Sequence, residues 1–277
     1  MKTVMLPSGI PVPVLGQGTW GMGETPERRQ EEIAALRFGL DLGLTLIDTA
    51  EMYGEGGAEE VVGEAIEGRR DEVYLVSKVY PFNASLHGTV AACERSLKRL
   101  RTDRLDLYLL HWRGEYPLSE TVEAFEALKE AGAIRDWGVS NFDLPDMEEL
   151  VTVPNGEEVA TDQVLYNLYH REVETALLPW CLKRHIPIMA YSPIEQGRML
   201  DDPLLKEIAS RHGITPAQAA LAWLLQKQEV IVIAKASKIE HVRQNREALD
   251  VHLTIRDLEA LDQAYPPPRR PTPLKVH

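Results

Sequence analysis

The chain has few cysteines and few basic residues for a protein of 277 residues. Its two cysteines, Cys93 and Cys181, lack the spacing of metal ligands, so we expect reduced core thiols in a cytoplasmic protein. Lysine and arginine number 30 against 43 aspartates and glutamates, which gives a formal net charge of −13. Nucleic acids and anionic membranes attract basic surfaces, so this balance argues against either as a partner.

Long hydrophobic runs are also missing. No stretch approaches the length of a membrane span, and Pro7 interrupts the N-terminal segment before it could form a signal peptide. No Ser/Gly-rich linker, charge run or repeat divides the chain. Because 44% of the residues are hydrophobic, the chain can bury a large core. We therefore expect one domain over residues 1–277.

What the sequence does contain is a regular alternation of strand-like and helix-like segments after a short hairpin at residues 3–5 and 12–14. With a first strand ending at Trp20, the alternation predicts an α/β protein with the (β/α)8 TIM-barrel fold and extra helices near the C-terminus. The other predicted strands cover residues 44–48, 73–78, 105–111, 134–141, 159–163, 186–191 and 230–235. The predicted helices cover residues 27–42, 58–67, 88–101, 120–131, 145–151, 175–184, 203–211, 216–226 and 239–249.

A glycine pattern near the N-terminus suggests a different fold. Gly16, Gly18 and Gly21 formally match the G-x-G-x-x-G fingerprint of Rossmann dinucleotide-binding domains. That fingerprint needs glycines that open a helix directly, whereas Gly23 and Pro26 delay the next helix. We therefore reject a Rossmann fold and expect these glycines to let a flat group approach the backbone.

Polar side chains end almost all the predicted strands. In a barrel all parallel strands end on the same face, which is where barrel enzymes carry out their chemistry. Asp48 alone would be read as a loop cap, but a whole ring of polar strand ends predicts a shared site. The ring consists of Asp48, Lys78, His111, Ser140 with Asn141, Gln163, Tyr191 and Lys235.

Within this ring, Asp48, Lys78 and Tyr53 predict an acid/base site. A lysine that ends an apolar strand is expected to be buried, and Asp48 on the neighbouring strand is its natural counter-charge. Tyr53 follows Asp48 by five residues, within reach of the ammonium. A nearby cation favours the phenolate, so we expect a lowered pKa for Tyr53, as a general acid requires. His111 is expected to hydrogen-bond a substrate oxygen, although a lone histidine is more often structural.

The ordered motifs resemble those of the aldo-keto reductase family. They run over nearly the whole chain and include Asp48-Thr49-Ala50-x-x-Tyr53-Gly54, Ser77-Lys78, His111-Trp112, Gly138-Val139-Ser140-Asn141-Phe142, Asp162-Gln163, Ala190-Tyr191-Ser192-Pro193 and residues 235–245. The resemblance implies an NAD(P)H-dependent enzyme that reduces aldehydes and ketones to alcohols. Tyr53 would donate the proton, Lys78 and Asp48 would tune it, and His111 would orient the carbonyl.

The resemblance also implies a nicotinamide cofactor that lies extended across the strand ends. Ser140, Asn141 and Gln163 would hold its carboxamide, and Tyr191 would stack on its ring; turn capping is the alternative for the first two. The implied cofactor-binding residues are Gly18, Thr19, Trp20, Asp48, Ser140, Asn141, Gln163, Tyr191, Ser192, Pro193, Ile194, Gln196, Gly197, Lys235, Ala236, Ser237, Lys238, His241, Gln244 and Asn245.

The phosphate region departs from the family pattern at two positions. Members that prefer NADPH commonly have an arginine where this chain has His241 and a serine where it has Ala236. Lys235, Ser237 and Lys238 still offer donors for a 2′-phosphate. We therefore expect NADPH (NADP+) as cofactor, with NADH also accepted and a smaller preference than an arginine would give.

The short loop after His111 and the brief C-terminal tail predict an open mouth for small aldehydes, 2-oxoaldehydes and ketones. Its lining would be Trp20, Met52, Tyr53, Tyr80, His111 and Trp112, although aromatic residues here would also suit simple packing. No metal is expected, and the resemblance suggests a monomer or weak oligomer.

Two other functions compete with carbonyl reduction. One is a non-catalytic, nicotinamide-sensing regulatory subunit, which the intact acid/base set argues against. The other is a Schiff-base lyase of barrel fold with Lys78 as nucleophile. That chemistry needs a neutral lysine, so Asp48 beside Lys78 argues against it.

Overall fold

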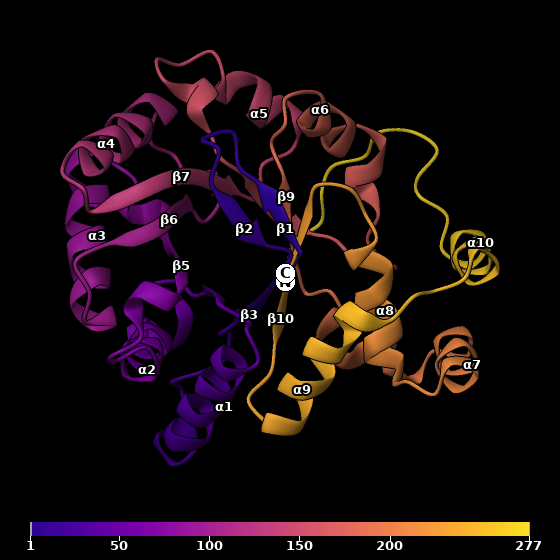
Figure 1. Ribbon diagram of the computed structural model, residues 1–277. Helices are drawn as coiled ribbons and strands as arrows, with labels where there is room; N and C mark the ends of the chain where they lie inside the picture. The colour runs from indigo at the N-terminus through magenta and orange to yellow at the C-terminus, as the bar shows by residue number, and fades with distance from the viewer. Residues whose placement is uncertain (1, 277) are drawn as a thin grey trace.

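Eight parallel strands close into a barrel in the computed structural model, which describes residues 2–276 (Figure 1). The first barrel strand, β3, pairs with the last, β10, so that Gly18 lies opposite Lys235. This closure confirms the predicted (β/α)8 fold. The barrel strands are β3 (Leu15–Gly18), β4 (Leu46–Asp48), β5 (Tyr74–Val79), β6 (Leu105–Leu110), β7 (Ile134–Ser140), β8 (Asp162–Leu165), β9 (Ile188–Tyr191) and β10 (Val230–Lys235).

The barrel strands are apolar runs because both of their faces are covered. In β10 the run from Val230 to Ala234 is buried throughout, as expected for a strand between a barrel interior and a helical layer. Gly16 in β3 is needed for packing, since a Cβ there would lie 2.5 Å from Leu46 Cγ. No helix opens directly after β3, which confirms the rejection of a Rossmann fingerprint.

Helices form the outer layer around the barrel (Figure 1). Most begin at a side-chain cap or a proline, as in α8, where Thr215 and Gln218 form a capping box. The helices are α1 (Arg29–Asp41), α2 (Gly57–Ala65), α3 (Leu86–Leu100), α4 (Leu118–Glu130), α5 (Leu144–Leu150), α6 (Leu177–Lys183), α7 (Pro203–His212), α8 (Pro216–Leu225), α9 (Ile239–Glu247) and α10 (Ile255–Ala264). Over residues 2–276 no helix is long and apolar enough to cross a membrane.

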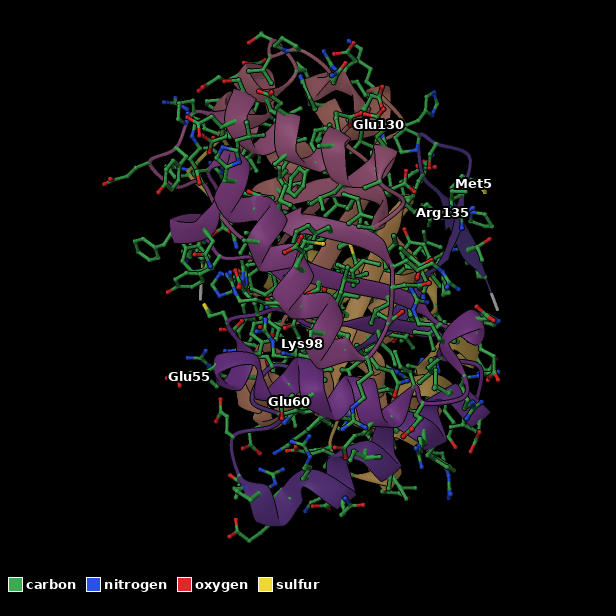
Figure 2. All side chains as sticks on the ribbon, turned by 90° about the vertical axis from the view of Figure 1, so that its left-hand side faces the viewer. Met5, Glu55, Glu60, Lys98, Glu130 and Arg135 are labelled. Carbon is green, nitrogen blue, oxygen red and sulfur yellow. The ribbon has the colours of Figure 1, made fainter. Side chains whose placement is uncertain are left out.

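The predicted hairpin forms from β1 (Thr3–Met5) and β2 (Pro11–Pro13), with Val4 opposite Val12. It lies at the N-terminal end of the barrel, whereas Glu55, on the loop after β4, lies at the other end; Figure 2 shows Met5 and Glu55 on opposite sides of the molecule. The strand ends that carry the predicted site therefore face away from the hairpin.

Several element boundaries differ from the predictions. The first barrel strand ends at Gly18 rather than at Trp20, which lies in the turn that follows. Strand β8 begins at Asp162 rather than at residue 159, although Ala160 already donates a hydrogen bond to the Trp137 carbonyl of β7. It also continues past Gln163 to Leu165, so Gln163 lies inside the strand. The extra helix α10 was given no boundaries from the sequence.

Candidate active site

The ammonium of Lys78 lies at the centre of the predicted acid/base set. Lys78 is fully buried on β5, and its Nζ donates to both carboxylate oxygens of Asp48 at 2.8 Å. The same nitrogen lies 2.8 Å from the Thr49 carbonyl oxygen and 3.2 Å from Tyr53 Oη. The structure therefore brings Asp48, Lys78 and Tyr53 together as the sequence predicted.

The loop between β4 and α2 gives Tyr53 its position. Tyr53 begins a short 3-10 turn, η2 (Tyr53–Gly56), in which Glu55 adopts the left-handed conformation with φ 55°. Glu51 anchors the start of this loop, because its Oε1 accepts hydrogen bonds from the Tyr80 backbone N–H at 2.8 Å and from Asn83 Nδ2 at 2.9 Å. The phenol is thus held above the ammonium by a loop that Glu51 anchors at its start.

The predicted direction of the Tyr53 pKa is wrong. Burial raises the pKa of Tyr53 well above its usual 10.0, and the negative charge of Asp48 raises it further. Burial also lowers the pKa of Lys78, although Asp48 opposes that shift. The desolvation of the phenol therefore outweighs the attraction of the neighbouring cation, and Tyr53 is a neutral phenol that is able to donate a proton.

His111 follows β6, and its ring lies against Tyr53, with centroids 5.6 Å apart and planes at 76°. Burial lowers its pKa well below 6.5, and the charge of Lys78 lowers it further. Its buried Nδ1 has no hydrogen-bond partner among residues 2–276. His111 is therefore a neutral imidazole, which carries one N–H donor for a substrate oxygen.

The polar residues predicted to hold a carboxamide form one hydrogen-bonded group. Ser140 Oγ donates to the Gln163 carbonyl at 2.7 Å, and Tyr191 Oη donates to Asn141 Oδ1 at 2.8 Å. Gln163 Nε2 donates to Asp48 Oδ1 at 2.8 Å. This last contact was not predicted, and it connects the amide group to the acid/base set.

The predicted phosphate region follows β9 and β10. After β9, Gln196 and Gly197 adopt positive φ angles within η7 (Glu195–Asp201), and the buried Glu195 accepts a hydrogen bond from Asn167 Nδ2 at 2.8 Å. After β10, Lys235 Nζ lies 3.3 Å from Ser237 Oγ. The structure thus brings Lys235 and Ser237 together.

Other predicted cofactor residues lie around these groups. Thr19 Oγ1 donates to the Asp48 carbonyl at 3.0 Å, so the end of β3 is tied to the end of β4. Ala236 and Asn245 are buried, whereas Lys238 and His241 are exposed. Gln244 Nε2 lies 3.3 Å from Glu240 Oε1 on the same helix, α9.

Sequence reasoning missed Arg28, which lies in η1 (Pro26–Arg28) after β3. Its Nη2 donates to Ser237 Oγ at 2.9 Å, across 209 residues of sequence. The signal that could have found it is barrel closure, because pairing of the first strand with the last brings the loops after β3 and β10 together.

Four of the rings predicted to line the mouth, those of Tyr53, His111, Trp112 and Tyr80, lie in successive contact. Ring centroids are 5.0 Å apart for His111 and Trp112 and 5.1 Å apart for Tyr80 and Trp112. Trp20 is 55% exposed at the mouth, and Met52 is 37% exposed. Phe82, which was not predicted, packs on Tyr80 at 5.1 Å and is 74% exposed.

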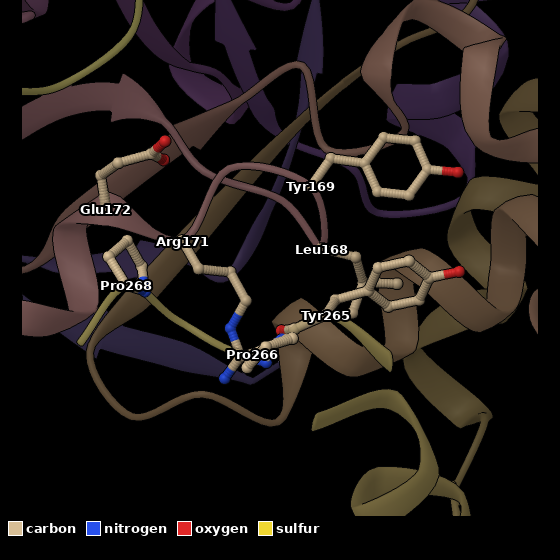
Figure 3. Close-up of a pocket in the computed structure, with 7 residues that line it drawn as sticks. All are labelled: Leu168, Tyr169, Arg171, Glu172, Tyr265, Pro266 and Pro268. Atoms are coloured by element: carbon tan, nitrogen blue, oxygen red, sulfur yellow. Dashed lines mark hydrogen bonds between the residues drawn. The ribbon is translucent and has the colours of Figure 1, made fainter. Parts of the chain in front are cut away.

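A separate pocket of about 290 Å³ lies between the loop after β8 and the C-terminal tail (Figure 3). Arg171 is engaged there by Glu174 and Asp262, and the Tyr169 and Tyr265 hydroxyls both bond to Asp202. The pocket contains none of the predicted site residues. Its lining is Leu168, Tyr169, Arg171, Glu172, Tyr265, Pro266 and Pro268.

Clusters of three or more His, Cys, Asp and Glu side chains that could hold a metal ion do not occur in the described part of the chain. The two cysteines are free thiols in the core.

Comparison with known proteins agrees with this geometry. The sequence pattern of the Aldo/keto reductase family matches residues 14–266. Methylglyoxal reductase YeaE of Escherichia coli (strain K12) is 52% identical over 280 residues, covering 99% of both chains. Glyoxal reductase of Bacillus subtilis (strain 168) is 34% identical over 263 residues, covering 94% of this chain and 91% of the relative.

Solved structures give the same result. An aldo/keto reductase from Klebsiella pneumoniae, in complex with NADP and acetate, is 53% identical with a TM-score of 0.96, covering 100% of this chain and 99% of that one. The thermostable aldo-keto reductase Tm1743, in complex with the inhibitor epalrestat, is 40% identical with a TM-score of 0.88, covering 95% of this chain and 99% of that one.

Proposed function

This chain belongs to the aldo/keto reductase family, and we propose that it reduces small aldehydes and ketones to alcohols with NADPH, using Tyr53 as the proton donor. The observation that carries the assignment is the contact of one buried ammonium, Lys78 Nζ, with both the Asp48 carboxylate and the Tyr53 hydroxyl. An intact set of this kind at the barrel mouth favours catalysis over a regulatory, nicotinamide-sensing role.

The residues at the strand ends fit a nicotinamide dinucleotide. Asn141 and Gln163 supply amide groups, and Tyr191 supplies a ring face beside them. The cations Arg28 and Lys235 both reach Ser237, a donor set suited to a phosphate. Relatives named in complex with NADP or NADPH support the same cofactor.

The protein side chains position the carbonyl and move one proton. When bound, the cofactor supplies the hydride to the carbonyl carbon. The neutral imidazole of His111 donates a hydrogen bond to the carbonyl oxygen, and Tyr53 gives that oxygen its phenolic proton. The phenolate left on Tyr53 is stabilised by the Lys78 ammonium at 3.2 Å, which Asp48 keeps in place.

We propose 2-oxoaldehydes such as methylglyoxal as preferred substrates. Relatives named methylglyoxal reductase and glyoxal reductase support this class. The mouth supports it as well, since it is lined by aromatic rings and the segment from β6 to α4 is short.

A Schiff-base lyase is disfavoured by the state of Lys78. Its Nζ is held by Asp48, Thr49 and Tyr53, so the amine has no free lone pair for attack on a carbonyl carbon. Borohydride added together with methylglyoxal should leave the mass of the protein at Lys78 unchanged. A trapped adduct on Lys78 would favour the lyase.

The central experiment follows NADPH absorbance with methylglyoxal, glyoxal, benzaldehyde and simple ketones. We expect Tyr53→Phe to lower kcat by about 10²–10⁴-fold, because it removes the transferable proton. The affinity for NADPH, measured by fluorescence quenching, should be unchanged. Equal rates for wild type and Tyr53→Phe would refute the assignment of the proton donor.

We also propose a cytoplasmic location and a monomeric or weakly oligomeric state. Two free, buried cysteines support a reducing compartment. Light scattering after size-exclusion chromatography measures the oligomeric state, and a stable tetramer would contradict the proposal.

A further inference from the structure

Two cations converge on one hydroxyl at the edge of the barrel where the first and last strands meet. Arg28 Nη2 donates to Ser237 Oγ at 2.9 Å, and Lys235 Nζ lies 3.3 Å from the same oxygen. A hydroxyl has two lone pairs and one hydrogen, so both lone pairs are in use and the hydrogen remains available. Within residues 2–276 no acceptor takes that hydrogen.

Neither cation forms an ion pair within residues 2–276. Lys235 is exposed at the end of β10; partial desolvation and then the charge of Arg28 lower its pKa, and Glu24 and Glu32 oppose this from beyond ion-pair distance. A guanidinium, an ammonium and a hydroxyl hydrogen gathered in this way, in a protein with a net charge of −13, form a donor set for a dianion.

The fold explains why Arg28 can take part. Strands β3 and β10 are neighbours, with Gly18 opposite Lys235, and helices α1 and α9 lie side by side after them (Figure 1). Arg243 of α9 lies over the Phe38 ring of α1, which fixes the two helices against each other. Arg28 comes directly before α1 and therefore lies beside the segment that joins β10 to α9.

His241 is a weaker phosphate donor than an arginine would be at its position. Its side chain is exposed on α9 and forms no hydrogen bond or ion pair within residues 2–276. A guanidinium, unlike an imidazole, is charged at every working pH and presents several donors in a planar fork. The guanidinium close to Ser237 is that of Arg28, which comes from the opposite end of the sequence.

We propose that Arg28 determines the preference for NADPH, by binding the 2′-phosphate of the cofactor together with Lys235 and Ser237. This inference rests on the proposed function, since it concerns the cofactor of that reaction. It also revises the expectation from the sequence: the preference for NADPH over NADH should be strong, although residue 241 is a histidine.

Calorimetric titration tests the proposal on the protein without turnover. The probes are adenosine 2′,5′-bisphosphate, which carries the 2′-phosphate, and AMP, which lacks it. We expect Arg28→Met to raise the Kd of the bisphosphate about tenfold or more and to change the Kd of AMP by less than about twofold. Arg28→Lys should fall between Met and wild type, because it keeps a point charge without the fork.

Arg29→Gln is the matched control. Arg29 is the next residue and carries the same charge, but it pairs with Glu60 and Glu64 of α2, away from Ser237. This variant should bind both probes as wild type does. In steady-state kinetics with methylglyoxal, Arg28→Met should raise the KM for NADPH much more than the KM for NADH.

Two results would overturn the proposal. The first is a Kd for the bisphosphate that stays within about twofold of wild type in Arg28→Met. The second is an equal rise in the Kd of both probes. That result would mean that Arg28 contacts the part of the nucleotide that the two probes share, and not the 2′-phosphate. Failure of the wild-type protein to oxidise NADPH with any carbonyl would instead count against the proposed function, and the titrations with the two probes would still decide the role of Arg28.

Discussion

At the scale of single residues, the site depends on a buried charge pair. Lys78 and Asp48 are both almost completely inaccessible to solvent, with side-chain exposures of 0% and 4%. A buried pair of this kind contributes little net stability, but the loss of one partner leaves the other charge without compensation. The pair is therefore explained by its function, which is to keep an ammonium beside Tyr53.

Asp48→Asn should lower both stability and activity. We expect a loss of about 3 kcal/mol in the free energy of unfolding, because Lys78 is left buried without a counter-charge. Adding Lys78→Met should recover most of this stability but none of the activity, since the phenolate of Tyr53 then lacks a cation. Urea unfolding and NADPH oxidation measure the two effects. A double variant no more stable than Asp48→Asn would contradict this account.

His111 predicts a pH dependence of stability. Its native pKa lies well below its usual 6.5, so between these values the unfolded chain binds a proton that the native state does not bind. Stability should therefore fall as the pH drops below 6.5, by up to about 1.4 kcal/mol per pH unit from this group. His111→Gln should lose less between pH 7 and pH 5 in urea unfolding. Parallel pH profiles for the two proteins would speak against a neutral, buried His111.

The residue types at the site could be predicted from the sequence, but their electrostatics could not. The sequence shows a lysine, an aspartate and a tyrosine at or near predicted strand ends, and the structure brings the three side chains together. The direction of the Tyr53 pKa depends on how burial balances two opposite charges, and this balance exists only once the loop has folded. Arg28 was missed for a similar reason, since it joins the site only through barrel closure.

At the scale of elements, one carboxylate joins α2, α3 and β5. Glu59 on α2 is fully buried and accepts hydrogen bonds from Ser77 Oγ at 2.6 Å and from Arg99 Nε at 2.6 Å. Ser77 directly precedes Lys78 on β5, so this contact fixes the strand from its outer side. The two helices thus hold the strand that carries the ammonium.

Glu59→Gln should destabilise the protein by about 3 kcal/mol, because it leaves the Arg99 guanidinium without its charge partner. Glu60→Gln is the control, since Glu60 is the next residue on α2 and its side chain is 52% exposed (Figure 2). That change should stay within about 0.5 kcal/mol of wild type. Thermal unfolding measures both, and equal shifts for the two variants would contradict the role given to Glu59.

Element types were easier to predict than element ends. The alternation of helices and strands could be predicted because each type of element has its own hydrophobic periodicity in the sequence. Helix α10 was expected only as one of the extra C-terminal helices, without boundaries, although Thr254 and Asp257 form a capping box at its start, because it follows the last strand and has no place in the alternation. The start of β8 was misplaced because Ala160 already bonds to β7 before the strand becomes regular.

At the scale of the whole molecule, closure of the barrel makes every strand a neighbour of two others. We propose that the chain behaves as a single domain, so urea unfolding should give one transition with the same midpoint by circular dichroism and by tryptophan fluorescence. Two separated transitions would show that part of the chain is stable without the rest.

The overall fold was the most predictable property, because it depends on many weak signals that agree. Each strand and helix signal is modest, but their order admits few arrangements other than a barrel. No single segment of the sequence predicts the closure of the barrel. Closure follows from the pairing of β3 with β10, which only the complete set of strands makes possible.

The pairing of β3 with β10 also has a consequence for synthesis on the ribosome. Strand β10 is the last barrel strand to be translated, so until it emerges, β3 and β9 both present open edges that invite pairing with other chains. Lys235 and Ser237 leave the ribosome at the same stage. The nascent chain therefore keeps open strand edges, and an incomplete cofactor site, until the last part of the barrel has been translated.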